Sequence, residues 1–546
     1  MSSAIRSHGF TALGPLHEAL AKLIGWRALG FAALLGAFSA LAFAPFHLTP
    51  ALIVSVTCLI WMMDGARGMI RWGRAMFMRG WAFGFGFFLI GMHWTASPFL
   101  VEPEKHAVFL WMPLIALPGG MALIWGAGAA LAGAFWSASP SRVFIFSIFF
   151  ALSELTRGHL FGGFPWNIFG TTWSPGHALS QAAAIGGVYW LTLLTLFISA
   201  APAAMVDTRE SRGVMGRALP LLIAVILIGF GWAWGAQRIA QPSAMSEDTV
   251  VLMDAGIPQA QKYSGRGEAV LERYGKFLRD VESDPNDIVI WPEGALPFEL
   301  LANNYALDVI SAYLGQRSLI VGTTRRSFDG RDGVYHNSLA VLQTESGRAE
   351  LIALYDKHRL VPFGELPASR IIPFGEYMSS FLPGPMQQLA TSGFEPGSEP
   401  TVLFPANLPP FVALICYEGL FPEITRTAGP QREEAKWIVT ISNDAWFGSG
   451  MGPAQHYAQN RYRAIESGLP MARVASRGAT AMVDGLGRET ARGQRVTGDP
   501  AGWVSSVVRT PLPAAMPVTP YQRYGPALFW LTLTGFVVLA FVSWRR

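Results

Sequence analysis

The sequence predicts a protein of two parts: a polytopic α-helical membrane domain of about eight transmembrane helices, and an α/β domain outside the membrane. Hydrophobic residues make up 51% of the 546 positions and charged residues only 14%, which is unusual for a soluble protein. Apolar segments of spanning length cluster in the first 240 residues and return at the end of the chain. Between them, short β-rich runs alternate with helical patterns, as in layered α/β folds. We expect a membrane domain over 1–240, an α/β domain over 241–515 and a last transmembrane helix in 516–546.

Eight apolar segments are candidates for the transmembrane helices, because a helix needs about 20 residues to cross the hydrocarbon core. The second and fifth carry the weakest signal. The segments are 27–43, 49–64, 79–98, 108–135, 142–157, 178–203, 218–236 and 526–543. Gly84 and Gly86 in the third segment favour close helix packing, because a nucleotide-binding loop would need a preceding strand.

Basic residues in the loops predict how these helices are oriented. With the N-terminus in the cytoplasm, the outer loops contain only Lys105 and Arg157. The inner loops then contain Arg67, Arg71, Arg74, Arg79, Arg142, Arg209, Arg212 and Arg217, and the tail ends on the same side with Arg545 and Arg546. By the positive-inside rule, both termini are cytoplasmic. Seven crossings leave residues from about 240 to 520 on the outer side.

Composition and motifs also exclude several classes of site. The net charge is +4 and there is no basic run, so nucleic acid is not an expected partner. The two cysteines, Cys58 and Cys416, lie far apart, and no C-x-x-C pair suggests a metal or redox centre. Residues 1–25 lack the layout of a signal peptide. We expect no cofactor and no metal.

The loop 161–170 between two membrane segments is aromatic and apolar but broken by glycine and proline. This composition places it at the membrane interface, on the outer side. Glu154 and Arg157 precede it, near a helix end. A charge inside the membrane is a functional hint, but near an end we favour a simple interfacial ion pair.

The α/β domain is expected to contain at least eight strands and two helices. The strands are 249–254, 287–291, 318–323, 337–342, 411–416, 437–442, 471–475 and 479–483, and the helices are 268–282 and 305–315. Residues 361–397 interrupt this alternation with many prolines and large apolar side chains. Such a loop is either an apolar lid over a site or a structural insertion packed on the domain.

Cys416 ends the apolar run 411–415 and is followed by Tyr417 and Glu418. A short, fully apolar run predicts a buried strand, and the end of such a strand is where α/β proteins place their ligands. On this stretch alone two interpretations stay open. Cys416 is either a small buried hydrophobic residue, as most free cysteines are, or a nucleophile.

Two further strand ends carry polar side chains suited to acyl chemistry. Glu293 follows the run 288–291, and Lys357 opens a segment that ends at Glu365. A thiol is only a few per cent ionised at neutral pH, so it needs a base, which a carboxylate can provide. Attack on an acyl group also creates an oxyanion, which a fixed cation stabilises. Each site alone is weak, since a glutamate after a strand is more often a solvated residue.

Together these motifs resemble the Glu-Lys-Cys triad of the nitrilase superfamily, over about residues 248 to 510. The resemblance implies an αββα sandwich. It rests on Trp291-Pro-Glu293, on Lys357 with Val361-Pro-Phe-Gly-Glu365, and on Cys416-Tyr-Glu418. The stretch 440–448, the pairs Gly452-Pro453 and Gln455-His456, and the surrounding membrane helices are similar to the apolipoprotein N-acyltransferase family in particular.

The resemblance implies roles for individual residues. Glu293 would be the general base, Cys416 the nucleophile and Lys357 the oxyanion-stabilising cation, with the backbone N–H of Tyr417 as a second donor. The supporting residues would be Glu365, Tyr417, Glu418 and Trp446. Where the family often has a tryptophan after an Ile-Pro-Gln segment, this chain has Tyr263. An aromatic platform for lipid remains, but its role is open.

The resemblance also implies a reaction, a ping-pong transfer in a bacterial inner membrane with the α/β domain in the periplasm. Cys416 would take an acyl chain from a phospholipid, typically phosphatidylethanolamine. It would pass this chain to the α-amine of a diacylglyceryl-cysteine at the N-terminus of an apolipoprotein. One alternative is a membrane-anchored nitrilase-type amidase. The other is a transporter with a degenerate outer domain, which the scarcity of ionisable residues in the predicted helices disfavours.

Overall fold

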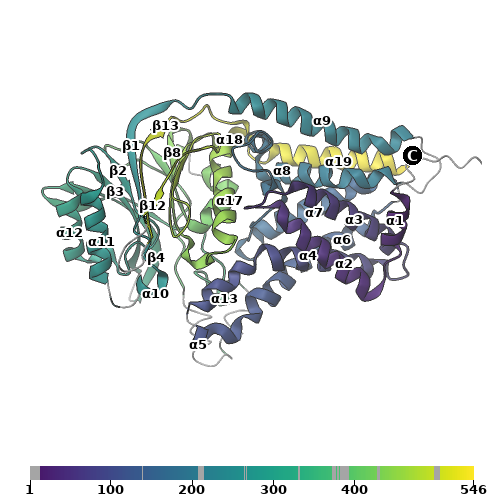
Figure 1. The fold of residues 1–546 in the computed structure, drawn as a ribbon, viewed down its shortest axis with the longest axis horizontal. Coiled ribbons are helices and arrows are strands. Elements are labelled where there is room, and N and C mark those ends of the chain that lie inside the picture. Colours follow the sequence, from purple (N-terminus) through teal and green to yellow (C-terminus); the bar gives the residue numbers. More distant parts are fainter. Residues whose placement is uncertain are drawn as a thin grey trace, which may run out of the picture.

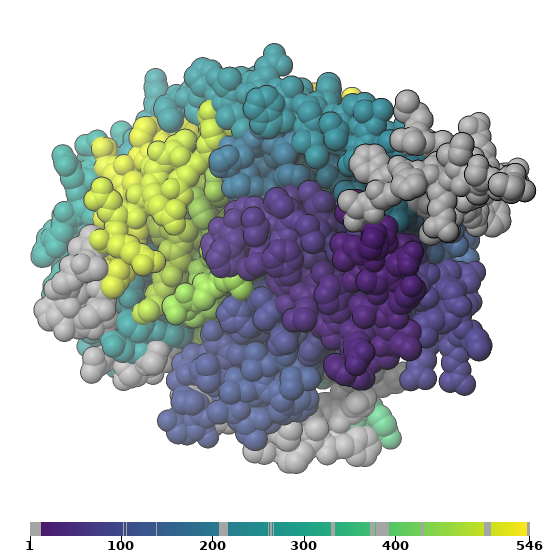
Figure 2. All heavy atoms as spheres, turned by 45° about the vertical axis from the view of Figure 1, so that its right-hand side comes forward, coloured from purple at the N-terminus to yellow at the C-terminus, as the bar shows by residue number. Residues whose placement is uncertain are grey.

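The computed structural model describes residues 13–101, 103–137, 139–206, 214–262, 265, 267–329, 332–371, 377, 380, 393–426, 431–496 and 504–545. A bundle of helices lies at one end of the molecule and two β-sheets lie at the other (Figure 1). In Figure 2 the N-terminal helices, in purple and blue, lie directly against the green and yellow segments of the α/β domain. The two parts therefore form one continuous body on this face.

The helical part comprises the first nine helices and the last two. Their bounds are α1 Gly14–Ala21, α2 Gly25–Ser39, α3 Thr49–Arg67, α4 Trp72–Gly91, α5 Pro103–His106, α6 Leu117–Ala134, α7 Ser141–His159, α8 Ala183–Ala200, α9 Val214–Ile239, α18 Pro520–Tyr524 and α19 Ala527–Arg545. Short 3-10 turns and one π turn, Met112–Ala116, extend several of them.

Six stretches of the described chain are long and apolar enough to cross a membrane: Gly25–Ala42, Thr49–Arg67, Ala107–Ala134, Ser141–Gly162, Leu179–Met205 and Arg217–Ile239. Trp72–Gly91 and His93–Leu100 make a seventh span if this pair, bent by 48°, crosses as one. Ala527–Val542 is apolar but shorter. Each of the eight predicted segments thus falls on a helix, although the number that cross depends on the bent pair and the last helix.

Glycines allow these helices to approach closely. A Cβ on Gly86 would lie 1.9 Å from the carbonyl oxygen of Ala33, and one on Gly84 would lie 3.1 Å from the Cβ of Ala122. α4 therefore contacts α2 through one glycine and α6 through the other, as small residues permit in membrane bundles. This agrees with the packing role predicted for both glycines.

The α/β domain contains two sheets. The seven-stranded sheet has the order β12-β13-β1-β2-β3-β4-β5, and the six-stranded sheet has the order β11-β10-β9-β8-β7-β6. The strands are β1 Met245–Asp254, β2 Ile288–Ile290, β3 Ser318–Asp329, β4 Asp332–Glu345, β5 Arg348–Asp356, β6 Val402–Leu403, β7 Phe411–Ile415, β8 Trp437–Asn443, β9 Met471–Ser476, β10 Ala481–Val483, β11 Glu489–Arg492, β12 Gln494–Val496 and β13 Ser505–Pro513. β1, β2 and β3 run parallel, as do β7, β8 and β9.

The two sheets face each other across an apolar core and helices cover their outer faces, which gives the expected αββα sandwich. In β7, Phe411, Ala413 and Ile415 point into the core between the sheets. Val412 and Leu414 point the other way, toward the helical part. α11 Gly267–Asp280 and α12 Asn304–Leu314 cover the seven-stranded sheet, and α17 Gly452–Ser467 stands between the other sheet and the membrane helices (Figure 1). The remaining helices are α10 Gln259–Lys262, α13 Ala368–Ile371 and α16 Pro422–Arg426.

The structure adds strands that the sequence did not predict, namely β5, β6, β11, β12 and β13. It also extends the predicted strands 318–323 and 337–342 into one long hairpin of β3 and β4. Of the loop 361–397, the segments 372–376, 378–379 and 381–392 lie outside the described residues, so the choice between lid and insertion stays a prediction.

Candidate active site

Glu293 lies just beyond β2, at the end of a parallel strand. Its Oε1 accepts hydrogen bonds from the side-chain amide of Asn337 at 2.7 Å and from Lys357 Nζ at 3.3 Å. Its Oε2 accepts the backbone N–H of Asn443 at 2.8 Å. The side chain is only 10% exposed. Three donors therefore hold this carboxylate in one orientation, facing the gap between the two sheets.

Lys357 follows β5 and is almost fully buried. Its Nζ lies 3.3 Å from Glu293 Oε1 and 2.8 Å from Glu365 Oε2. Burial by itself lowers the pKa of the ammonium, but the two carboxylates outweigh burial and raise the pKa above its usual value. Lys357 is therefore a permanent cation at neutral pH.

Cys416 is the first residue of a 3-10 turn, η10 Cys416–Leu420, that follows β7 directly. Its φ of +51° lies in the left-handed region, which is rare for a residue with a side chain and concentrates at functional sites. Burial and the negative charge of Glu293 raise the pKa of the thiol, and Lys357 opposes them only in part. Cys416 is therefore a thiol at neutral pH and needs a base to react.

The peptide of Cys416 is held by a buried chain of polar side chains. His456 Nε2 donates to the carbonyl oxygen of Cys416 at 3.1 Å, and Nδ1 of the same ring lies 2.9 Å from Asp444 Oδ1. Arg473 Nη2 lies 2.8 Å from the other oxygen of Asp444. Burial raises the pKa of Asp444, but Arg473 and His456 outweigh it and lower the pKa. The ionised carboxylate of Asp444 therefore holds the ring of His456 in place, and His456 in turn holds the peptide of Cys416.

Glu418 accepts four hydrogen bonds in a fully buried position. The donors are the Tyr355 hydroxyl at 2.8 Å and the backbone N–H groups of His358 at 2.7 Å, Arg359 at 3.0 Å and Ile415 at 2.8 Å. Three donors flank Lys357 in sequence and the fourth precedes Cys416. Glu418 therefore connects the segment of Lys357 to the segment of Cys416.

Glu365 and Asn337 complete the polar cluster. The Asn337 amide nitrogen donates to Glu365 Oε1 at 2.8 Å as well as to Glu293. Glu365 Oε2 also accepts the backbone N–H of Val361 at 2.9 Å. Asn337 thus separates two carboxylates of like charge that share one lysine. Asn337 was not predicted as a site residue, although it opens the predicted strand 337–342, whose last four residues are apolar.

The membrane part contributes to the site through the loop 161–170. The Tyr417 hydroxyl donates to the carbonyl oxygen of Gly163, and the Trp166 ring stacks on His456 with centroids 5.6 Å apart. Arg157 Nη1 donates to the carbonyl oxygens of Phe164 and Trp166 at 2.6 and 2.8 Å.

Arg157 is paired with Glu154 at 2.6 Å, and the two side chains are 1% and 0% exposed. The predicted ion pair is therefore present, and its position at the membrane interface stays a prediction. The pair is buried within the protein, where Arg157 also donates to the backbone of the loop.

Trp446 is 38% exposed, in the turn Asp444–Phe447 after β8, and Tyr263 lies outside the described residues. Lys262 was not predicted: its Nζ donates to the carbonyl oxygen of Gly294 at 2.7 Å, and burial lowers its pKa to about 8. Among the described residues, no group of three or more His, Cys, Asp or Glu side chains is arranged to hold a metal.

Comparison with known proteins gives two family matches. Residues 35–201 match the model of the apolipoprotein N-acyltransferase N-terminal domain, and residues 255–499 match the model of the carbon-nitrogen hydrolases. Among curated relatives, an apolipoprotein N-acyltransferase of Caulobacter vibrioides is 37% identical, with 92% of each chain covered. One of Rhodopseudomonas palustris is 32% identical over 94% of this chain and 95% of its own.

Comparison with solved structures gives a further match. It is an amidase from Nesterenkonia sp. AN1, 16% identical, covering 53% of this chain and 97% of its own with a TM-score of 0.33.

Proposed function

The chain belongs to the apolipoprotein N-acyltransferase family, and from this membership we propose that it moves an acyl chain between two membrane-anchored substrates. The donor is a membrane phospholipid, with phosphatidylethanolamine as the proposed species. The acceptor is the α-amine of a diacylglyceryl-cysteine at the N-terminus of an apolipoprotein. The observation that carries the proposal is the buried cation of Lys357, bonded to Glu293 and Glu365 beside the strained Cys416.

In the first half-reaction, the Sγ of Cys416 attacks the ester carbonyl of the phospholipid and Glu293 accepts the thiol proton. The raised thiol pKa supports this role for a base, since little thiolate forms without one. Lys357 and the backbone N–H of Tyr417 stabilise the oxyanion. Collapse of the intermediate breaks the ester bond, and Glu293 returns its proton to the departing lysophospholipid oxygen.

In the second half-reaction, the acceptor amine attacks the thioester carbon and Glu293 accepts a proton from the nitrogen. The C–S bond breaks, the amide forms, and the proton returns to the Cys416 sulfur. Glu365 and Asn337 keep Lys357 and Glu293 in position through both steps. In each half-reaction, the carboxylate of Glu293 therefore accepts a proton and then returns it.

The chain is a multi-pass membrane protein, and its spans support a site at the membrane surface. We place the chain in the bacterial inner membrane with both termini in the cytoplasm and the α/β domain in the periplasm, on the basis of the loop arginines. A site there serves two lipid-anchored substrates without moving their acyl chains through water.

Mass spectrometry of the intact protein and of its proteolytic peptides tests the nucleophile. The full chain in detergent is incubated with phosphatidylethanolamine of defined acyl composition and no acceptor. We expect one acyl mass on a peptide that contains Cys416, and its release when a diacylglyceryl-cysteine peptide is added. Cys416→Ala should form no adduct, with Cys58→Ala as the matched control that does. An adduct retained in Cys416→Ala would refute the assignment, and turnover of small amides without any acyl adduct would favour the amidase instead.

A further inference from the structure

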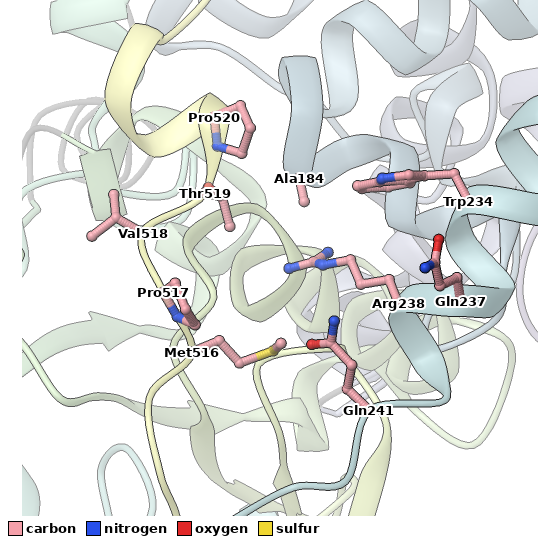
Figure 3. Close-up of a pocket in the computed structure, with 10 residues that line it drawn as sticks. All are labelled: Ala184, Trp234, Gln237, Arg238, Gln241, Met516, Pro517, Val518, Thr519 and Pro520. Atoms are coloured by element: carbon pink, nitrogen blue, oxygen red, sulfur yellow. The ribbon is translucent and has the colours of Figure 1, made fainter.

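A cavity lies where the chain leaves the helical part, away from Cys416. It has a volume of about 360 Å³, and its lining includes Ala184, Trp234, Arg238, Gln241, Met516 and Thr519. These residues come from the end of α9, the start of α8 and the segment that leads into α18. Figure 3 shows the guanidinium of Arg238 and the amide of Gln241 pointing into the space beside Met516 and Pro517.

The walls of this cavity are fixed by hydrogen bonds to neighbouring elements. Arg488 Nη1 donates to the carbonyl oxygen of Ile239 at 2.7 Å, which anchors the end of α9 to the α/β domain. The backbone N–H of Met516 donates to Gly468 at 2.9 Å, and the Thr519 hydroxyl donates to the carbonyl oxygen of Glu466. The cavity is therefore a built feature and not a gap between loose segments.

Arg238 is the cation of the cavity, and among the described residues no carboxylate forms a direct ion pair with it, although the charge of Asp484 attracts it. Its one hydrogen bond there runs from Nη1 to the neutral amide oxygen of Gln181, at 2.9 Å. The nearby Asp484 is already paired with Arg488 at 2.7 Å. Gln237 and Gln241 are neutral. The guanidinium, a planar group with five donors, can therefore accept a further anion.

The level of the cavity relative to the membrane indicates which anion Arg238 would bind. Arg238 is the penultimate residue of the span Arg217–Ile239, and Trp234 lies one turn earlier on the same helix. Tryptophan and arginine at the end of a span occupy the level of the lipid headgroups. The anion that every phospholipid presents at this level is its phosphodiester, which matches the guanidinium fork.

We propose that this cavity binds the phosphodiester headgroup of a membrane phospholipid, at a site separate from the candidate active site. α17 separates the two: His456 near its start contacts Cys416, whereas Gly468 after its end supports Met516. Twelve residues of helix correspond to roughly 18 Å. A lipid here would bridge α9 and the segment 516–520, and so join the two connections between the membrane helices and the α/β domain. This inference requires the membrane spans but not the acyl-transfer reaction.

Native mass spectrometry of the full chain tests the site. Cys416→Ala is used as the background, so that no lipid is consumed. The protein in detergent is titrated with phosphatidylglycerol, and we expect one bound lipid in addition to the lipid that the candidate active site holds. Arg238→Gln should weaken this binding roughly tenfold or more, because it removes hydrogen bonds to a charged group. The matched control is Arg523→Gln, which removes the same charge from an exposed position on α18, outside the cavity, and should leave binding unchanged.

A charge series at Gln241 tests the site without removing Arg238. Gln241→Glu should weaken lipid binding and Gln241→Lys should strengthen it. These two variants test whether the cavity binds an anionic headgroup even if Arg238→Gln fails to fold. Folding is checked by acyl-adduct formation on Cys416 in the same variants with the cysteine intact, which should persist.

Equal binding in the Arg238 and Arg523 variants, or no response to the charge at position 241, would overturn the proposal. Competition by sn-glycerol 3-phosphate at the same concentration as the lipid would also overturn it, because the site would then hold a soluble phosphate. The two proposals can fail separately. Absence of lipid binding at the cavity in a protein that forms the Cys416 adduct would count against this inference alone. Absence of the adduct in a protein that binds the lipid would count against the proposed function alone.

Discussion

The hydroxyl of Tyr417 donates a hydrogen bond to the carbonyl oxygen of Gly163, which joins the residue after the candidate nucleophile to a loop of the membrane part. Gly163 has a φ of +79°, and a Cβ there would lie 2.1 Å from the carbonyl oxygen of Gly158. Neither the backbone nor the surroundings of Gly163 allow a side chain. The site is therefore completed by both parts of the protein, with the loop held in place by Arg157.

Arg157→Met should slow acylation of Cys416 roughly tenfold or more. The change removes two charge-assisted hydrogen bonds to the loop and leaves Glu154 as a buried charge without its cation. Rates of adduct formation and thermal unfolding in detergent measure the two effects. The double variant Glu154→Gln, Arg157→Met should recover stability but not the rate. Full recovery of the rate would show that the pair is structural only.

Glu293→Gln should reduce acyl transfer about 10²- to 10⁴-fold while making Cys416 more reactive toward iodoacetamide. The negative charge of Glu293 raises the pKa of the thiol, so a neutral amide lowers that pKa and more thiolate is present at pH 8. The charge of Asp444 also raises the pKa of the thiol and is unchanged in this variant, so the pKa falls only part of the way. Alkylation rates between pH 6 and 10, in a Cys58→Ala background, measure the effect. A slower alkylation would contradict the electrostatic account.

Lys357→Met should also reduce acyl transfer, by about 10²- to 10³-fold, but with the opposite effect on alkylation. The ammonium lowers the pKa of the Cys416 thiol, so its removal raises that pKa and delays alkylation to higher pH. The same iodoacetamide profile as for Glu293→Gln provides the comparison. If both variants moved the profile in one direction, the changes would reflect altered access to the thiol and not charge.

Glu418→Gln should lower stability and activity together. Tyr355, His358 and Arg359 all donate to Oε1, so an amide oxygen there leaves the N–H of Ile415 facing the amide NH₂, and a buried donor without a partner costs about 1 to 3 kcal/mol. Thermal unfolding and acyl-adduct formation are measured on the same samples. Glu433→Gln, at an exposed position, is the control and should change neither. Lost activity at unchanged stability would indicate a direct chemical role for Glu418.

The sequence predicted the elements whose pattern is local. The run 411–415 is wholly apolar because β7 lies between two packed layers, and such runs are recognisable as buried parallel strands. Glu293 and Lys357 follow strands of the seven-stranded sheet and Cys416 follows β7 of the other sheet, so these residues come close because the two sheets pack face to face. The eight apolar segments were recognisable for a similar reason, since length and composition suffice.

Elements that depend on distant partners were not predicted. β5 contains Arg348, Glu350 and Asp356, so it does not read as a buried strand, and it lies at the edge of its sheet. The roles of Asn337 and of the pair Glu154 and Arg157 follow from contacts across the fold. No periodicity along the chain shows that a loop of the membrane part supports the peptide of Cys416.

The pairing of β1 with β13 determines when the seven-stranded sheet can be completed during synthesis of the chain. β1 directly follows α9, its Met245 lies opposite Pro513 of β13, and β13 directly precedes the last two helices. β1 lies inside the seven-stranded sheet, between β13 and β2, so this sheet cannot close until the ribosome has synthesised almost the entire chain. One edge of β1 therefore stays unpaired until the final strand is synthesised. Truncation before β13 should thus destabilise the α/β domain and not merely remove an anchor.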